Sequence, residues 1–208
     1  MSAEQAIVFV IDDDASVRDA IADLVRSVGL AARCFDSPQE FLAAKRPDAP
    51  ACIVLDIRLP GPSGLEFQRT LAASNIHAPV IFISGHADIA MSVRAMKSGA
   101  IEFLTKPLPE QQLLDAIHAG LERDRARRRE ERTVAELRAR FDKLTPRERQ
   151  VLALVVTGRR NKQIAAEAKL SEMTVKVHRS QIMRKMHAKS LVDLVRMTDA
   201  LGVPGEKA

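Results

Sequence analysis

Two groups of carboxylates follow apolar runs that have the length and composition of buried β-strands. Asp12, Asp13 and Asp14 come directly after AIVFVI, and Asp56 comes directly after ACIVL. Three acids on adjacent residues repel one another, so they stay ionised together only where they are well solvated or share a cation. Asp at a strand-to-helix junction is also a common helix N-cap, and Asp14 fits that simpler role. The remaining acids point to a cation site, which other parts of the chain have to support.

Two further polar side chains lie at the ends of later strand-like runs. Ser84 ends PVIFIS, and Lys106 comes shortly after AIEFL, directly before Pro107. In an open parallel sheet the site lies outside the carboxyl ends of the strands, so this hydroxyl and this ammonium are expected beside the carboxylates. Oxygen ligands with open positions suit Mg²⁺. A hydroxyl and an ammonium at the same rim could hold the oxygens of a phosphoryl group attached to one carboxylate.

The first half of the chain alternates strand-like and helix-like patterns. Apolar, β-rich runs predict strands at 6–11, 30–35, 51–55, 79–84 and 100–104. Amphipathic patterns, several of them closed by Gly, predict helices at 17–29, 38–45, 64–74 and 88–99. Alternation of this kind is typical of an α/β doubly wound sheet with five parallel strands. Unbroken apolar runs in the first, third and fourth strands predict that helices cover both of their faces.

Length and composition limit the possible classes of protein. The 208 residues are enough for two domains, and 46% hydrophobic residues are enough to build their cores. The apolar runs are too short to cross a bilayer and no signal or transit peptide is recognisable, so we expect a cytoplasmic protein without a membrane partner. Cys34 and Cys52 lack metal-ligand spacing and are predicted to be buried hydrophobes. His86 also lacks a partner at such spacing and is expected to have a loop role.

Charge divides the chain into two halves. Residues 1–121 carry 10 Lys and Arg against 15 Asp and Glu, whereas residues 122–208 carry 22 against 12. An acidic half with clustered Asp fits a cation site, and a basic half fits a polyanionic partner. A helical pattern runs from Leu113 to Leu144, interrupted only by Gly120, and its middle is highly charged. We interpret 122–143 as a helical linker whose last turns either form a coiled-coil or docking seam or are simply solvated.

The C-terminal part of the chain predicts a compact, all-helical domain. TPRE at 145–148 has the pattern of a capping box, and Ser171 and Ser190 are placed to open two later helices. In the helix opened by Ser171, a projection at 100° per residue places one largely apolar set on a buried face: Val175, Arg179, Ile182 and Met186. The opposite face carries Met173, Val177, Ser180 and Arg184, flanked by Lys176 and Gln181.

The exposed face of this helix favours DNA as the polyanionic partner. An exposed Val among cations and amides suits a major groove, where its tip can meet a thymine methyl group. Basic side chains at the rim are expected to neutralise phosphates; they are Arg159, Arg160, Lys162, Lys185 and Lys189. A basic helix bundle that binds a protein remains an alternative. RNA is a weaker one, because the chain has no Trp or Tyr to stack on bases.

Residues 5–121 resemble the receiver domain of bacterial two-component response regulators. The motifs are Asp12-Asp13, Asp56 with Pro60 and Gly64 downstream, Ser84, and Lys106-Pro107. The resemblance implies a flavodoxin-like sheet in the strand order 2-1-3-4-5, with Asp56 phosphorylated by a sensor histidine kinase. It implies Mg²⁺ bound by Asp12, Asp13, Asp56 and the backbone carbonyl of Arg58. It further implies that Ser84 and Lys106 contact the phosphoryl group and that Phe103 is the switch aromatic. This chain departs from the common pattern of receiver domains at two positions: it has Ser84 where these domains often have Thr, and Phe103 where they often have Tyr.

Residues 144–201 resemble the LuxR-type helix-turn-helix of the FixJ and NarL groups through LTPRERQVL, NKQIA and SEMTVKVHRSQIMRKM. The resemblance implies a four-helix domain with a recognition helix at about 172–186. Lys176 and Val177 are the leading candidates for base contacts. Thr174, His178 and Arg179 are expected nearer the DNA backbone. The other expected DNA-binding residues are Ser180, Arg184 and Lys185. The family usually has Gly at Lys169 and often at His187. Lys169 must therefore adopt a positive φ, at a cost of about 1 kcal/mol, or the turn must change.

Together these features predict a receiver at 1–121, a linker at 122–143 and a DNA-binding domain at 144–208. We expect a FixJ-like response regulator and not an enzyme. Phosphorylation of Asp56 would favour a homodimer, paired through the fourth helix and fifth strand, that binds an inverted repeat in promoter DNA and regulates transcription. Activation through RNA polymerase is the commoner outcome in this family. Two alternatives stay open. The first is a Mg²⁺-dependent phosphatase that uses Asp56, although Arg58 stands where such an enzyme would have a second acid to protonate the leaving group. The second is a transcription factor controlled without phosphorylation.

Overall fold

The chain folds into two compact units joined through one helix. The computed structural model describes residues 5–61, 63–85 and 89–203, and it divides into the units Met1–Arg128 and Arg129–Ala208. His86, expected in a loop, lies outside the described residues. Within the described ranges, no helix is both long enough and apolar enough to cross a membrane.

The first unit is built on a parallel sheet. Its strands are β1 Ile7–Ile11, β2 Ala31–Phe35, β3 Ala51–Asp56, β4 Val80–Ser84 and β5 Glu102–Thr105. They pair in parallel in the order β2-β1-β3-β4-β5, which confirms the predicted fold class. Every residue of β1, β3 and β4 is buried. These strands are covered on both faces, as their unbroken apolar runs predicted.

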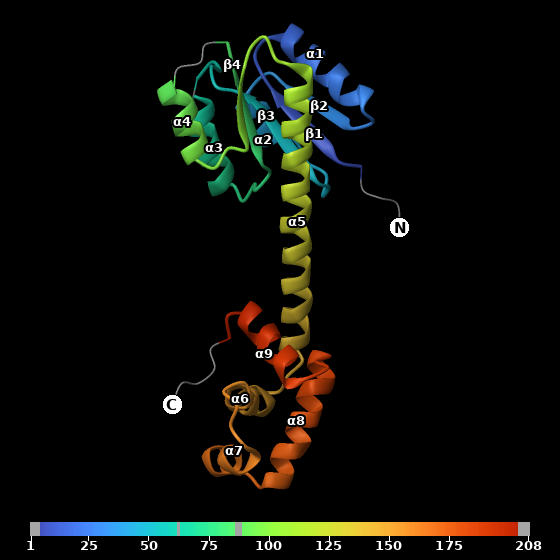
Figure 1. Cartoon of the computed structure of the whole chain (residues 1–208), viewed down its shortest axis with the longest axis vertical. Helices are drawn as coiled ribbons and strands as arrows, with labels where there is room; N and C mark the ends of the chain where they lie inside the picture. The colour runs from blue at the N-terminus through green and yellow to red at the C-terminus, as the bar shows by residue number, and fades with distance from the viewer. Residues whose placement is uncertain (1–4, 62, 86–88, 204–208) are drawn as a thin grey trace. The chain divides into compact units, whose positions relative to one another are not determined.

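Alternate side chains of the strands enter two cores, one on each face of the sheet. Helices lie against both faces of the sheet (Figure 1). The helices of this unit are α1 Ala15–Ser27, α2 Pro38–Ala43, α3 Gly64–Ala73, α4 Ile89–Lys97 and the long α5 Glu110–Asp142. Phe82 of the sheet and Phe67 of α3 belong to one core, together with buried residues of α2 and α4. Val54 of the sheet belongs to the other core with Ile21 of α1 and Ile117 of α5. Strand residues therefore alternate between the two layers of helices.

Helix α5 is continuous through Gly120, where the sequence pattern had suggested an interruption. A Cβ atom at Gly120 would lie only 2.7 Å from Sγ of Cys52 on β3. Glycine is therefore required for close packing of this helix on the sheet, and the neighbouring packing outweighs its low helix propensity. The division between the two units falls inside α5, after Arg128, later than the expected end of the receiver at residue 121.

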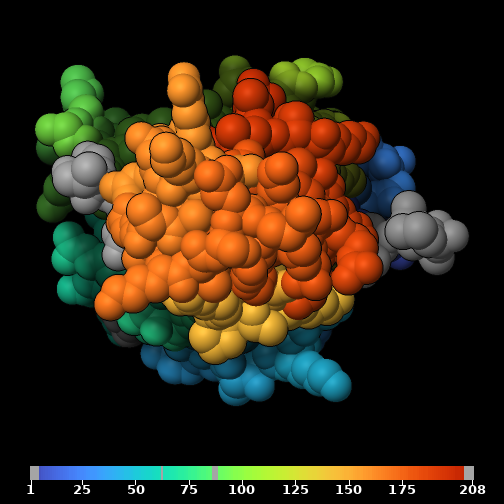
Figure 2. All heavy atoms as spheres, turned by 90° about the horizontal axis from the view of Figure 1, so that it is seen from below, coloured from blue at the N-terminus to red at the C-terminus, as the bar shows by residue number. Residues whose placement is uncertain are grey.

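Up to residue 203, where its described part ends, the second unit contains four helices after α5: α6 Pro146–Val155, α7 Asn161–Ala168, α8 Glu172–Met186 and α9 Leu191–Ala200. Thr145 caps α6 in a complete capping box with Glu148, as the TPRE pattern predicted. One apolar core holds the helices together and includes Leu152, Ile164, Val175, Ile182 and Leu194. Figure 2 shows a face of this unit on which α7 and α8, in orange, supply much of the surface.

Candidate functional site

Three carboxylates converge at the carboxyl ends of the neighbouring strands β1 and β3. Asp12 and Asp13 directly follow β1, and Asp56 is the last residue of β3. Asp12 and Asp56 are buried and Asp13 is exposed, and one carboxylate oxygen from each lies within 4.8 Å of the other two. Hard oxygen ligands with one side open to water suit Mg²⁺, which keeps several water molecules when it binds to proteins. The donor set therefore fits this cation.

Lys106 connects two of these carboxylates. Its Nζ atom donates hydrogen bonds of 2.6 Å to Oδ2 of Asp12 and 2.6 Å to Oδ2 of Asp56. The backbone N–H of Lys106 donates to the carbonyl of Ser84, at 2.8 Å, which fixes the start of the following loop against the end of β4. The structure thus brings to one edge of the sheet all five residues that the sequence placed there: Asp12, Asp13, Asp56, Ser84 and Lys106.

The charges at this edge are unbalanced. Burial raises the pKa of Asp12 above its ordinary value, although hydrogen bonds from Lys106 and from the Asp14 N–H oppose the change. Burial alone would lower the pKa of the Lys106 ammonium, but hydrogen bonds to Asp12 and Asp56 hold that pKa above its ordinary value. Lys106 therefore stays charged, yet one ammonium faces three carboxylates. A divalent cation would offset the remaining negative charge.

The loop after β3 is shaped around Asp56. The N–H of Arg58 donates to Oδ1 of Asp56 at 2.8 Å, which orients the carboxylate. Behind it, a Cβ atom at Gly64 would lie 2.6 Å from the Asp56 carbonyl oxygen and 3.2 Å from the ring of Phe82. Only glycine allows α3 to begin so close to the strand, which explains the chemical need for Gly64 downstream of Asp56.

The loop after β1 gives Asp14 and Arg18 supporting roles. The Asp14 carboxylate accepts the Ser16 N–H at 2.8 Å and caps α1, as its simpler interpretation predicted. Nη1 of Arg18 donates to the main-chain carbonyl of Asp12 at 2.6 Å and so holds the carbonyl beside the acids in place. Sequence reasoning missed Arg18, and its position on the first turns of the helix after the acids was the only available signal.

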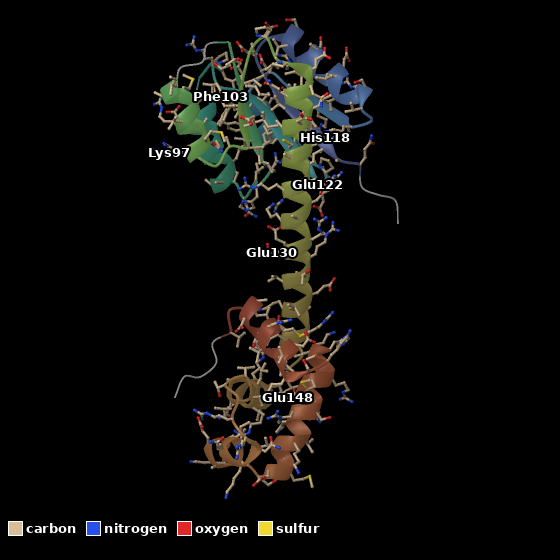
Figure 3. The ribbon with its side chains drawn as sticks, viewed as in Figure 1. Lys97, Phe103, His118, Glu122, Glu130 and Glu148 are labelled. Atoms are coloured by element: carbon tan, nitrogen blue, oxygen red, sulfur yellow. The ribbon has the colours of Figure 1, made fainter. Side chains whose placement is uncertain are left out.

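The two remaining residues implied in switching lie on β4 and β5. Ser84 is fully buried at the end of β4. Phe103 of β5 is in register with Phe82, and its half-buried ring packs against the core that contains Phe82 (Figure 3). The inward movement of this ring stays a prediction.

Helix α8 separates buried and exposed side chains as predicted. Val175, Ile182 and Met186 are fully buried, whereas Met173 is 70% and Val177 is 48% exposed. Of the other expected DNA contacts, Lys176, Ser180 and Arg184 are exposed and Thr174, His178 and Arg179 are half-buried. The helix therefore presents apolar tips among cations and hydroxyl groups, a combination able to contact base edges.

Lys185, expected among the DNA contacts, has a partner inside its own unit. Its Nζ lies 2.6 Å from Oε2 of Glu148, whose side chain is buried. Glu148 also accepts the N–H of Thr145 at 2.7 Å. Burial alone raises the pKa of Glu148, but the hydrogen bonds from Lys185 and Thr145 hold that pKa below its ordinary value. Sequence reasoning missed this pair because Glu148 was interpreted only as part of the capping box.

Fewer cations around the exposed face of α8 are available for phosphate contacts than the sequence predicts, because some have partners within their own unit. Arg159 pairs with Glu167 of α7. Arg179 of α8 donates from Nη1 to Oδ1 of Asn161 at 3.3 Å. The second contact holds α7 beside α8, and both contacts compete with any contact to phosphate. The other expected rim cations, Arg160, Lys162 and Lys189, stay candidates for phosphate contacts.

The turns that flank the recognition helix have the conformation predicted for glycine. Lys169 ends α7 with φ 52° and His187 ends α8 with φ 58°, both in the left-handed region. Of the two expected outcomes at Lys169, a positive φ or a changed turn, the structure therefore shows the positive φ.

Comparison with known families assigns both units. Residues 8–118 match the response regulator receiver domain, and residues 142–198 match the family described as bacterial regulatory proteins, luxR family. Nodulation protein W of Bradyrhizobium diazoefficiens is 54% identical over 97% of this chain and 89% of its own length. Response regulator protein TodT of Pseudomonas putida is 46% identical over 97% of this chain and 88% of its own length.

Solved structures agree with these matches. The response regulator StyR has a TM-score of 0.83 at 49% identity, over 94% of this chain and 98% of the StyR chain. Full-length FixJ from B. japonicum has a TM-score of 0.56 at 37% identity, over 94% of this chain and 97% of the FixJ chain. Both domain types occur here in one chain, in the same order as the predicted units. The chain therefore belongs to the response regulators in which a receiver domain is joined to a LuxR-type helix-turn-helix DNA-binding domain.

Proposed function

We propose that this response regulator is switched by transfer of a phosphoryl group to Asp56. The carboxylate of Asp56 attacks the phosphorus of a phosphohistidine on a sensor histidine kinase. The bond from phosphorus to nitrogen breaks, the imidazole leaves, and an acyl phosphate forms on Asp56. The observation that carries this proposal is the convergence of Asp12, Asp13, Asp56 and Lys106 at one edge of the sheet.

The residues proposed to hold Mg²⁺ are Asp12, Asp13, Asp56 and the backbone carbonyl of Arg58. When bound, the ion neutralises charge that builds up on the phosphoryl oxygens during transfer. Lys106 already lies within hydrogen-bonding distance of Asp56 and supplies an ammonium to a phosphoryl oxygen there. Ser84 offers a hydroxyl from the next strand, and Phe103 moves inward when Ser84 follows the phosphoryl group.

A groove beside the acceptor site supports docking of the kinase. It has a volume of about 350 Å³ and lies between α1 and the loop that leads into α5. Its lining combines apolar side chains such as Val17, Leu24 and Leu108 with Lys106 at the edge. A kinase helix that packs on these apolar residues can bring its phosphohistidine to the open side of Asp56, so the groove fits an amphipathic helix.

Two exposed surfaces support the output. Helix α4 exposes Ile89 at 84%, Val93 at 44% and Met96 at 45%, and apolar area of this kind favours pairing with a second receiver through α4 and β5. Helix α8 is proposed to enter the major groove, with Lys176 and Val177 contacting bases. A dimer would then bind an inverted repeat in promoter DNA in the cytoplasm and activate transcription through RNA polymerase.

The phosphatase alternative has less support. Arg58 stands two residues after the proposed nucleophile, where a phosphatase of this type needs an acid for the leaving group, and the Arg58 N–H is used to orient Asp56. Relatives of the chain are described as response regulators or transcriptional regulatory proteins. Turnover of a phosphate ester would distinguish this enzyme from a switch.

Light scattering on the full chain tests the proposal. The mass is measured with and without Mg²⁺ and beryllium fluoride, which mimics an aspartyl phosphate, for the wild type and for Asp56→Asn. We expect a change from monomer to dimer in the wild type only. Phosphate incorporation from acetyl phosphate is measured in parallel, and no incorporation into the wild type would favour control without phosphorylation.

A further inference from the structure

Asp124 is a buried carboxylate on α5 that takes no part in the acceptor site. It is 1% exposed. Its Oδ2 accepts the N–H of Ala51 at 3.0 Å and Nε of Arg128 at 2.8 Å, and its Oδ1 accepts Nε of Arg127 at 3.1 Å. Arg128 also pairs with Asp48 in the segment before β3. We call these five residues the Asp124 clamp.

The carboxylate of the clamp is ionised at neutral pH. Burial alone raises the pKa of Asp124, but hydrogen bonds from Arg127, the Ala51 N–H and Arg128 hold that pKa below its ordinary value. Hydrogen bonds to a charged group are about twice as strong as those between neutral groups. A buried charge with this many donors is therefore a firm attachment for α5.

The clamp lies where the apolar attachment of α5 ends. Leu113, Ile117 and Leu121 are buried against the sheet, and Leu121 is the last of this series. Asp124 and Arg128 continue the same face of the helix with polar side chains. Residues 129–133, which follow, are all exposed. Figure 3 labels Glu122 and Glu130 on the turns of α5 that flank the clamp.

The other end of the clamp is the strand that carries the proposed phosphoacceptor. Ala51, whose N–H binds Asp124, is the first residue of β3, and Asp56 is its last. All six residues between these ends, inclusive, are buried. The clamp therefore ties the start of the acceptor strand directly to the helix that leads into the second unit.

We call the stretch of α5 that is fixed to the receiver its receiver-held part. We propose that the Asp124 clamp sets the end of this part at Arg128, and that the DNA-binding response to phosphorylation depends on the clamp. Without the clamp, residues 122–128 would join the solvated stretch that follows. A short solvated helix is marginally stable, so it would fray and pass on little movement from the receiver. The second part of this inference rests on the proposed function, whereas the first part does not.

The test compares full-length wild type with Asp124→Asn and with the control Glu122→Gln. Glu122 lies on the same turn, is exposed and pairs only at the surface with Arg125. Hydrogen exchange is measured by mass spectrometry for residues 122–128 and 113–121. Affinity is measured, with and without Mg²⁺ and beryllium fluoride, for a DNA duplex that the wild type selects from a random-sequence pool. Arg128→Gln, which leaves the pair of Asp124 with Arg127 intact, serves as a milder second variant.

We expect residues 122–128 of Asp124→Asn to exchange roughly tenfold to a hundredfold faster, with 113–121 unchanged. The gain in DNA affinity on adding beryllium fluoride should be lost in Asp124→Asn and retained in Glu122→Gln. Unchanged exchange at 122–128 would overturn the first part, and a retained gain in affinity would overturn the second. A wild type without any gain would overturn the proposed function, and the exchange result would still decide where the receiver-held part of α5 ends.

Discussion

Replacing Lys185 with Met separates a structural role for this cation from a role in DNA binding. Glu148 is 1% exposed, and its carboxylate accepts hydrogen bonds from Lys185 at 2.6 Å and from the Thr145 N–H at 2.7 Å. Methionine keeps an unbranched apolar side chain but removes the ammonium. The buried carboxylate then keeps its main-chain donor and loses its counter-ion.

The expected loss of stability follows from this geometry. Removing one partner of a buried ion pair is destabilising by about 3–5 kcal/mol when the remaining charge is left uncompensated. The Thr145 N–H still binds Glu148, and the side chain of Lys185 is 27% exposed, so water can replace part of the lost interaction. We therefore expect the free energy of unfolding of the second unit to fall by about 2 kcal/mol, which is roughly a 30-fold change in the unfolding equilibrium.

Hydrogen exchange of the full chain in rising urea measures this change, because peptides from α6 and α8 report on the second unit and receiver peptides serve as a reference. Lys185→Arg should stay close to wild type, and Lys176→Met, which removes an exposed cation from the same helix, should leave stability unchanged. The reasoning would be refuted if Lys185→Met kept full stability while the salt dependence of DNA binding fell by about one counter-ion.

The same pair makes the stability of the second unit depend on pH. Because the pKa of Glu148 in the folded chain lies below its ordinary value of 4.5, the unfolded chain binds a proton more readily than the folded one. The contribution of the pair is complete above the unfolded pKa and is lost as the pH falls through the folded pKa. Between about pH 5 and pH 3, the wild type should therefore lose more stability in this unit than Glu148→Gln does.

Three further substitutions test other features. Lys169→Gly should stabilise the second unit by about 1 kcal/mol in urea unfolding, because Gly adopts a positive φ without strain; a loss of stability would contradict this. Gly64→Ala should destabilise the receiver by about 1–3 kcal/mol, since its Cβ would meet the Asp56 carbonyl, and receiver peptides in hydrogen exchange report it. Lys176→Ala should lower the salt dependence of DNA binding by about one counter-ion and leave unfolding unchanged, whereas equal binding at all salt concentrations would remove Lys176 from the contacts.

Most of the acceptor site was predictable because it depends on local patterns and one rule of topology. Apolar runs locate the strands, and parallel strands bring their carboxyl ends to one edge, so Asp12, Asp56 and Lys106 had to lie near each other. The turn at Lys169 was predictable for a similar reason, since the conformation at the end of a helix is a local property.

Apart from the local contact of Arg18 with Asp12, the contacts that sequence reasoning missed join residues far apart in the chain. Glu148 and Lys185 are 37 residues apart, and both had a sufficient local explanation, one as a helix cap and one as a surface cation. Asp124 binds Ala51 across 73 residues and lies in a run of charges that resembles a solvated helix. Helix propensity alone predicts an interruption at Gly120, because propensity takes no account of the packing of this residue against Cys52. In each case the deciding interaction lies outside the window that a pattern covers.

The close approach of Gly120 to Cys52 provides a chemical reporter of the docking of α5. Cys52 is fully buried, and burial raises the pKa of its thiol to about 12, so it is nearly unreactive while the helix covers it. In a Cys34→Ser background, a thiol reagent can label Cys52 only during moments when α5 lifts from β3. The labelling rate, divided by that of an exposed thiol, then gives the fraction of time the helix is open. A native cysteine of the chain can thus report the movement of α5, without a cysteine introduced for the purpose.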